Sequence, residues 1–331
     1  MPRTSSEALL RPDLGCLAYE YSLNAASQGF IGRQVLPTFY TNLQSAVYPV
    51  IDAGTFLELP ETERAARAAY ARGDWQFGDD HYYCKEHGWE EPVDDSEAAL
   101  FRNYFDAEVV AVKRATLMVL RSQERRVARK VMDTEKITNA PVTKAWDDYA
   151  NADPLADVVK AKEVFRYTVG LKPNALVLDE DVLRHVSMCA AVLDRVKYTN
   201  PNAIRGELTL EQLKAYFGVE NIFVAGAVVY NSAPRKKDKK IETVWPLDKV
   251  LLACISSGGQ DLKEPALGRT FAWEEDAPGE LVTEQYREEQ TRGDVYRVRQ
   301  NTDECLQFPG AGYILTGVTT GHSANDGFDL P

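Results

Sequence analysis

The sequence predicts an α+β fold, and three observations lead to this prediction. Residues 94 to 132 contain neither glycine nor proline, and Asp94 and Glu97 have the spacing of a capping box, which predicts one long helix. After Pro141, short apolar runs alternate with amphipathic helical patterns. Near the end of the chain, Val295, Val298 and Leu306 are spaced as in a sheet, and residues 313 to 318 are strand-like. Helices and strands are therefore both expected, around a long central helix.

Composition and charge exclude several classes of protein. The chain has 331 residues, of which 44% are hydrophobic, and this is enough for a sizeable core and about two domains. A net charge of −12 disfavours general electrostatic binding to nucleic acid. An odd number of cysteines, five, argues against a disulfide framework and favours a reducing compartment. No signal peptide or membrane span is predicted.

The N-terminal region, residues 1–46, is predicted to be an extended arm, because it shows neither helical period nor strand alternation. Its apolar side chains, among them Phe30, Ile31, Leu36 and Phe39, need a surface that the rest of the protein or a neighbour supplies. This predicts self-association. We expect deletion of residues 1–40 to leave a folded subunit that cannot assemble.

Residues 47–93 are interpreted as an aromatic, polar excursion between two better-ordered parts. Trp75, Phe77 and Tyr82 lie in this excursion, and together with Phe30 and Phe39 they are the predicted contacts between subunits.

In the long helix, we place Val112 on the packed face and Arg126 on a solvated face. Local signals then predict a series of shorter elements: helices at 154–168, 180–192 and 209–216, and strands at 175–178, 222–230, 241–245, 250–255 and 313–318. The basic run at 235–240 is interpreted as a solvated hairpin tip, and the tail after residue 320 as frayed.

Candidate catalytic and metal-binding residues are few. His81, Cys84 and His87 stand three residues apart and could bind zinc with Asp79, Asp80 or Glu86 as a fourth ligand; they could also serve a thiol hydrolase. Nearby glycines make this segment a poor helix, and structural zinc sites normally show two paired ligand clusters, so we favour no metal and no cofactor. His185 is interpreted as a partly buried helix residue, and no phosphate-binding glycine loop is present. No enzyme activity is predicted.

The order of several motifs resembles that of the major capsid proteins of tailed bacteriophages, with the Hong Kong 97-type fold, and in particular those related to the lambda head protein. The stretches that carry the resemblance are Arg64-Ala65, 83–88, 92–95, Arg121–Arg125, Ala145-Trp146, Ala152–Val158 and Gly170–Leu178. This ordered set runs from about residue 47 to about residue 318.

The resemblance implies a division of the chain into functional regions. It makes 1–46 an N-terminal arm, 47–93 an extended loop over an adjacent subunit, 94–154 a peripheral domain with the spine helix, 155–279 an axial domain, 280–320 the closing strands of the peripheral domain, and 321–331 a flexible tail. Because the spine helix begins near residue 95, we expect no fused scaffold before it.

The implied function is a head protein that self-assembles through pentamers and hexamers into an icosahedral shell around double-stranded DNA, without sequence-specific binding to that DNA. The implied partners are a separate scaffolding protein, a portal protein and a decoration protein, with no membrane. The protein is expected in the virion after assembly in the cytoplasm of the host bacterium. A shell protein of a bacterial encapsulating nanocompartment is the alternative with the same fold, and a metal or thiol hydrolase is the alternative from another class.

Overall fold

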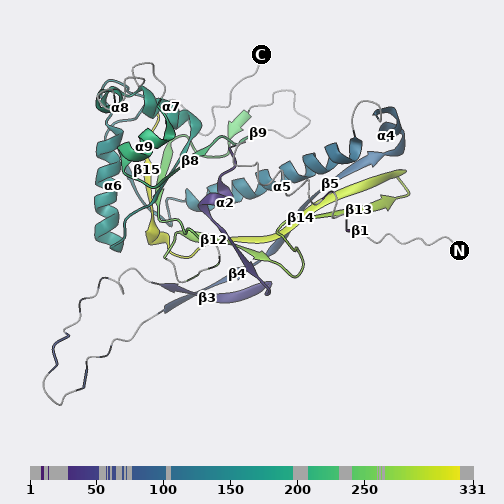
Figure 1. Ribbon diagram of the computed structural model, residues 1–331, viewed down its shortest axis with the longest axis horizontal. Helices are drawn as coiled ribbons and strands as arrows, with labels where there is room; N and C mark the ends of the chain where they lie inside the picture. The colour runs from purple at the N-terminus through teal and green to yellow at the C-terminus, as the bar shows by residue number, and fades with distance from the viewer. Residues whose placement is uncertain are drawn as a thin grey trace.

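The structure is a computed structural model of the 331-residue chain. It describes residues 29–51, 77–101, 106–196, 208–230, 241–258 and 265–320, together with residues 9, 10, 14, 57, 59, 62–64, 69, 70, 72, 260 and 262. Two sheets and a long helix dominate the described part (Figure 1). The structure therefore has the α+β character that the sequence predicts.

The larger sheet is built around the long strand β14, which pairs with three neighbours. Its strand order is β1-β13-β14-β12-β2, and β5 also pairs with β14. All pairs are antiparallel except β12 with β2, which is parallel. The bounds of these strands are Leu9–Leu10 (β1), Thr38–Thr41 (β2), Lys85–Asp94 (β5), Gly268–Trp273 (β12), Val282–Glu288 (β13) and Gly293–Leu306 (β14).

Two helices, α4 (Asp95–Phe101) and α5 (Ala107–Val131), replace the single predicted helix. The prediction of one unbroken helix is wrong because Asp106 adopts an extended backbone and caps α5, its side chain accepting a hydrogen bond from the Glu108 N–H. Helix α5 is about 37 Å long and packs along β14 and β5 (Figure 1). Val112 is fully buried on this packed face, as predicted.

The smaller sheet has the order β6-β15-β11-β7-β8 and is covered by helices (Figure 1). Its strands are Thr138–Pro141 (β6), Ala175–Asp179 (β7), Asn221–Ala225 (β8), Lys249–Ala253 (β11) and Gly312–Thr316 (β15). The helices of this part are Pro154–Val169 (α6), Glu180–Met188 (α7), Ala190–Val196 (α8) and Leu210–Phe217 (α9), and a short 3-10 helix, Pro309–Ala311 (η3), precedes β15. Apolar residues of β7 and β11 alternate between two hydrophobic clusters, one on each face of the sheet.

Most elements predicted after Pro141 are confirmed, with two interruptions. The predicted helix at 180–192 is divided at Cys189, whose backbone is extended. The predicted strand at 222–230 is divided at Gly226 into β8 and β9 (Val228–Tyr230), and β9 pairs with β10 (Ile241–Thr243). The predicted hairpin tip at 235–240 lies outside the described residues, although the strands on either side of it pair as a hairpin requires.

Strands β3 (Ser45–Ile51) and β4 (Phe77–Tyr83) form a separate antiparallel hairpin (Figure 1). They lie within the predicted excursion at 47–93, but the structure divides that region differently. After Tyr83 the chain enters β5, which runs along β14 as part of the larger sheet. The base of the excursion is therefore built into the subunit.

The prediction that the arm lacks partners within the subunit is wrong for residues 31–41. Ile31, Val35 and Leu36 are at most 2% exposed and pack in a cluster with residues of α5 and of the smaller sheet. This segment forms α2 (Gly32–Val35) and then β2. Ile31, Val35 and Leu36 are therefore covered by the rest of the same chain and do not need a neighbour.

Candidate assembly surfaces and the joint at Glu124

A buried carboxylate joins three distant parts of the chain. Glu124 of α5 is 3% exposed, and its Oε1 accepts hydrogen bonds from the Ile31 N–H at 2.9 Å and from the Trp245 Nε1 at 2.6 Å. Its Oε2 accepts one from the Gly32 N–H at 2.7 Å. The carboxylate thus satisfies N–H groups that the start of α2 leaves without helical partners. We call this arrangement the Glu124 joint.

Two opposing effects act on the pKa of Glu124. Burial raises the pKa of Glu124 above its ordinary value, while the three donors and the nearby Arg33 favour the charged form. A Cβ at position 32 would lie 2.6 Å from Glu124 Oε2, so a side chain there would displace the carboxylate from the Gly32 N–H. Glycine at position 32 lets the joint fix the segment before β2 against the long helix.

Two residues further along α5, Arg126 forms a partly buried contact with β14. Its Nη2 lies 2.9 Å from Glu304 Oε1, and its Nε lies 3.0 Å from Glu304 Oε2. Glu304 is 3% exposed, and Arg126 Nη2 also donates to Thr302 Oγ1. The prediction that Arg126 lies on a solvated face is wrong, since this arginine is the partner that compensates a buried carboxylate.

Stacked aromatic rings attach the β3–β4 hairpin to the larger sheet. The Tyr82 ring lies parallel to Phe271 of β12 with centroids 4.3 Å apart, and Tyr48 and Phe39 contact the same ring at 5.4 Å and 5.5 Å. The Tyr82 hydroxyl is 2.8 Å from Thr41 Oγ1. These contacts fix the base of the hairpin, and its direction, relative to the body of the subunit.

The predicted inter-subunit contacts occupy different environments. Phe30 and Phe39 are half-buried, and Phe39 packs on Phe271 of its own subunit. Tyr82 is 5% exposed, so its ring serves packing inside the subunit and offers little surface to a neighbour. Phe77 begins β4, and Trp75 lies outside the described residues. The structure brings Phe39 and Tyr82 together on Phe271. Contact with a neighbouring subunit stays a prediction for all five residues.

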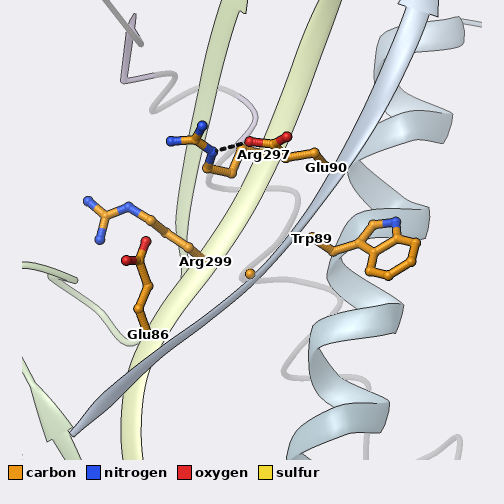
Figure 2. Close-up of a pocket in the computed structure, with 6 residues that line it drawn as sticks. Glu86, Trp89, Glu90, Arg297 and Arg299 are labelled. Carbon is orange, nitrogen blue, oxygen red and sulfur yellow. Dashed lines mark hydrogen bonds and ion pairs between the residues drawn. The ribbon is translucent and has the colours of Figure 1, made fainter.

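A shallow pocket of about 600 Å³ lies on the paired strands β5 and β14. It is lined by Glu86, Gly88, Trp89, Glu90, Arg297 and Arg299. Figure 2 shows the two arginines and the two glutamates on one side of the strands, with Trp89 turned toward the helix on the other side.

The charges of this pocket are paired with one another and with adjacent carboxylates. Arg297 Nε lies 2.6 Å from Glu90 Oε1, and Arg299 bonds to Glu284 at 3.0 Å and to Asp276 at 2.5 Å. Because both arginines are engaged by carboxylates, the pocket does not favour an anion. It has the character of a polar contact surface, not of a catalytic cleft.

The structure does not bring His81, Cys84 and His87 into a ligand set. His81 is exposed on β4, Cys84 is fully buried, and no group of three His, Cys, Asp or Glu side chains suited to a metal occurs among the described residues. Burial raises the pKa of the Cys84 thiol to about 12, which is unfavourable for a thiolate nucleophile. His185 is half-buried on α7 as predicted, and its Nδ1 lies 2.9 Å from the Tyr149 hydroxyl.

Comparison with known proteins shows that this chain is similar to phage proteins over nearly its whole length. A curated relative named "Major capsid protein", from Burkholderia phage BcepMu, is 27% identical over 96% of this chain and 99% of its own length. A solved phage-related protein from Bordetella bronchiseptica RB50 superposes with a TM-score of 0.70 at 22% identity, over 94% of this chain and 98% of that one. No family model matches the sequence.

Two further structures extend the likeness at low identity. A solved structure from Microbacterium phage Oxtober96 superposes with a TM-score of 0.56 at 11% identity, over 87% of this chain and 91% of the other. A virus-like particle from Pyrococcus furiosus gives 0.55 at 14% identity, over 92% and 98%. This chain has the phage capsid fold. The resemblance to phage major capsid proteins and the α+β capsid fold that it implies are both confirmed.

Within this capsid fold, the Glu124 joint is the feature that sequence reasoning missed. The motif Arg121–Arg125 carries part of the resemblance, yet Glu124 was given no role there. The available signal was a single acidic residue in the otherwise basic last part of the helix. Its partners, Ile31 and Trp245, are 93 and 121 residues away and carry no local pattern that would identify them.

The described residues hold no helix that is long and apolar enough to cross a membrane.

Proposed function

We propose that this chain is a major head protein whose copies assemble into an icosahedral shell that encloses the double-stranded DNA of a tailed phage. The observation that carries the proposal is the match to a phage major capsid protein over nearly the whole of both chains, 96% and 99%. The capsid fold supports it independently, because the likeness to solved structures also spans most of the chain.

The distribution of polar groups fits a structural role. Two groups of buried polar side chains join elements of the fold: the Glu124 joint and the Arg126–Glu304 pair. The pocket on β5 and β14 is shallow and has paired charges. A shell needs such a rigid subunit, because many weak, symmetric contacts per subunit add up only if each subunit presents its surfaces in a constant geometry.

Each region of the fold receives a role in the proposed shell. The larger sheet with α4 and α5 forms the peripheral domain, and the smaller sheet with α6, α7, α8 and α9 forms the axial domain that meets its copies in pentamers and hexamers. This division differs from the predicted bounds, 94–154 and 280–320 for the peripheral domain and 155–279 for the axial domain, because β12 belongs to the larger sheet and β6 and β15 belong to the smaller one. The β3–β4 hairpin leads to the extended loop that lies over an adjacent subunit. The predicted contacts between subunits remain proposals: Phe30, Phe39, Trp75, Phe77 and Tyr82.

The proposed partners follow from the same role. Besides copies of itself, the chain would contact a separate scaffolding protein during assembly, a portal protein at one vertex and a decoration protein on the outer surface. It would enclose DNA without sequence-specific binding, in a virion assembled in the bacterial cytoplasm. No catalytic activity is part of the proposal.

The contents of the particles test this function. Particles that contain this chain are purified from the cells that produce them, treated with nuclease, and analysed for protected nucleic acid and for co-purifying proteins. We expect protected double-stranded DNA of uniform length. Shells that contain a defined protein cargo and no DNA would contradict the proposal and support the nanocompartment alternative.

A further inference from the structure

The long helix α5 presents a face to solvent whose charged residues are all basic. At 100° per residue, positions 110, 114, 117, 118, 121, 122, 125 and 129 fall in one sector of the helix, opposite the buried positions 112, 116, 119, 123 and 127. We define the outer face of α5 by these eight residues: Val110, Arg114, Leu117, Met118, Arg121, Ser122, Arg125 and Arg129. In Figure 1, α5 lies along one side of the larger sheet, which covers the opposite, buried face.

This face is unusual for the chain that carries it. The whole protein has 50 acidic against 38 basic residues, yet the charged residues of the outer face are four arginines. Arg114 has one distant carboxylate, Glu91, at 3.6 Å. Arg121, Arg125 and Arg129 form no salt bridge with any residue in the part of the chain that the structure describes. Arg125 and Arg129 are exposed and available to a ligand, whereas Arg121 is half-buried and its Nε is buried.

The arginines are regularly spaced along the helix. Arg121, Arg125 and Arg129 follow at intervals of four residues, or about 6 Å, and the row from Arg114 to Arg129 is about 22 Å long. Carboxylates four residues apart on a second helix repeat with the same interval. A guanidinium binds a carboxylate with two parallel hydrogen bonds, so a row of arginines can fix the register of an acidic helix.

Two kinds of polyanion could bind this row of arginines, an acidic protein segment or duplex DNA, and the apolar side chains between the arginines favour the protein. Val110 is 39% exposed, and Leu117 and Met118 are half-buried within the row. Such residues gain by burial against a protein partner but not against phosphates. The net charge of −12 also repels duplex DNA, which carries one charge per about 1.7 Å, more strongly than a short acidic segment. Both observations favour a protein.

We propose that the outer face of α5 binds an acidic, amphipathic helical segment of a separate assembly protein. This inference rests on the proposed function, since it supplies the site at which a scaffolding partner would hold the subunit. Carboxylates of the segment pair with Arg121, Arg125 and Arg129, and its leucine-type side chains cover Leu117 and Met118.

The test measures peptide binding to the full-length, unassembled chain. The probe is a fluorescent synthetic helix of about 24 residues, with glutamates four residues apart and leucines between them, which covers the row. Its control carries glutamine in place of every glutamate. The variant Arg125→Gln/Arg129→Gln removes two charges of the row. The variant Lys160→Gln/Arg166→Gln removes the same charge from the exposed side of α6.

We expect the acidic helix to bind the wild-type chain and the α6 variant equally, and the Arg125→Gln/Arg129→Gln variant on the order of tenfold more weakly. Binding should weaken as salt is raised, and the glutamine control should not bind. Equal binding to both variants, or none to the wild type, would overturn the proposal. Tighter binding of a duplex DNA through the same arginines would overturn it in favour of nucleic acid. None of these results depends on shell formation, so the proposed function is tested separately.

Discussion

At the scale of single residues, the carboxylate of Glu124 is tested by replacing one oxygen atom. In Glu124→Gln, the remaining oxygen can still accept from Ile31 and Trp245, but an amide group would face the Gly32 N–H. The new side-chain amide and the Gly32 N–H are then two buried donors that face each other, and neither has an acceptor. We expect the free energy of unfolding to fall by about 2 kcal/mol in chemical denaturation.

The matched control for that variant is Glu135→Gln, an exposed position just after the end of α5. It should change the free energy of unfolding by less than about 0.5 kcal/mol. If the two variants were equally stable, the Glu124 joint would not contribute to stability.

Asp179 supplies a second residue-scale prediction, which concerns pH. Its Oδ1 accepts from the Asp181 N–H and so caps α7, while its Oδ2 is buried with no hydrogen-bond partner among the described residues. Burial, with a contribution from the charge of Glu180, raises the pKa of Asp179 to about 7. Between about pH 4 and pH 7 the folded state therefore keeps a proton that the unfolded state has lost.

It follows that the contribution of Asp179 to stability is largest at low pH and is lost as pH rises through about 7, with a slope of at most about 1.4 kcal/mol per pH unit. Asparagine keeps the cap and stays neutral, so Asp179→Asn should become more stable than the wild type at pH 8. Asp106→Asn, at the exposed cap of α5, is the control. A stability difference between Asp179→Asn and the wild type that does not change with pH would contradict this account.

At the scale of elements, the two faces of α5 differ in their tolerance of the same substitution. Val112→Asp places an unpaired carboxylate at a fully buried position, which costs several kcal/mol. Val110→Asp makes the same change two residues earlier, at a side chain that is 39% exposed. We expect the first variant to unfold or aggregate and the second to keep its thermal transition. Equal tolerance would mean that the helix is solvated all round.

The sequence predicts that deletion of residues 1–40 leaves a folded subunit, but the packing of the segment that contains α2 and β2 predicts the opposite. Deleting residues 1–40 removes Ile31, Val35 and Leu36 from the core and three backbone positions from the pairing with β12. The truncated chain should therefore lose its cooperative thermal transition. The single change Leu36→Ala should cost about 3 kcal/mol, because Leu36 is fully buried. A sharp transition in the truncated chain would restore the interpretation of this segment as a free arm.

Elements with local signals were predictable from the sequence, and elements defined by distant partners were not. Helix α6 starts at Pro154 and ends before Gly170, whose positive φ of 74° terminates it, and both signals are local. The role of residues 31–41 depends on a parallel pairing with β12, more than 200 residues later in the chain, and no pattern in the segment indicates it. The break before α5 was missed because Asp106 is one capping residue within a continuous helical pattern.

The predicted site residues were also limited by partners that lie far away in the sequence. Phe39 and Tyr82 were selected because aromatic side chains in a polar segment need a surface, and the structure supplies that surface as Phe271 of the same chain. Sequence reasoning identified side chains that need a partner, but it could not tell a neighbouring subunit from a distant strand. Arg126 was assigned to solvent for the same reason, since Glu304 lies 178 residues further on.

At the scale of the whole molecule, assembly is expected to need control from outside the chain. Residues 31–41 and 85–94 are built into the subunit itself, so they are not available to set the curvature of a shell. Expressed without other phage proteins, residues 1–331 should give mixed products that include capsomers, small shells, tubes and sheets. A homogeneous population of virion-sized shells would refute external size control and would leave the capsid assignment intact.

The central claim, that this chain is a shell-forming subunit, is tested most directly by electron microscopy of the purified protein as its concentration is raised. Contacts that are individually weak but repeated by symmetry should produce assemblies above a threshold concentration. The account predicts shells or tubes whose walls show rings of five or six copies, with α5 and the larger sheet at the periphery of each ring. A protein that stays monomeric at every concentration and ionic strength would contradict it.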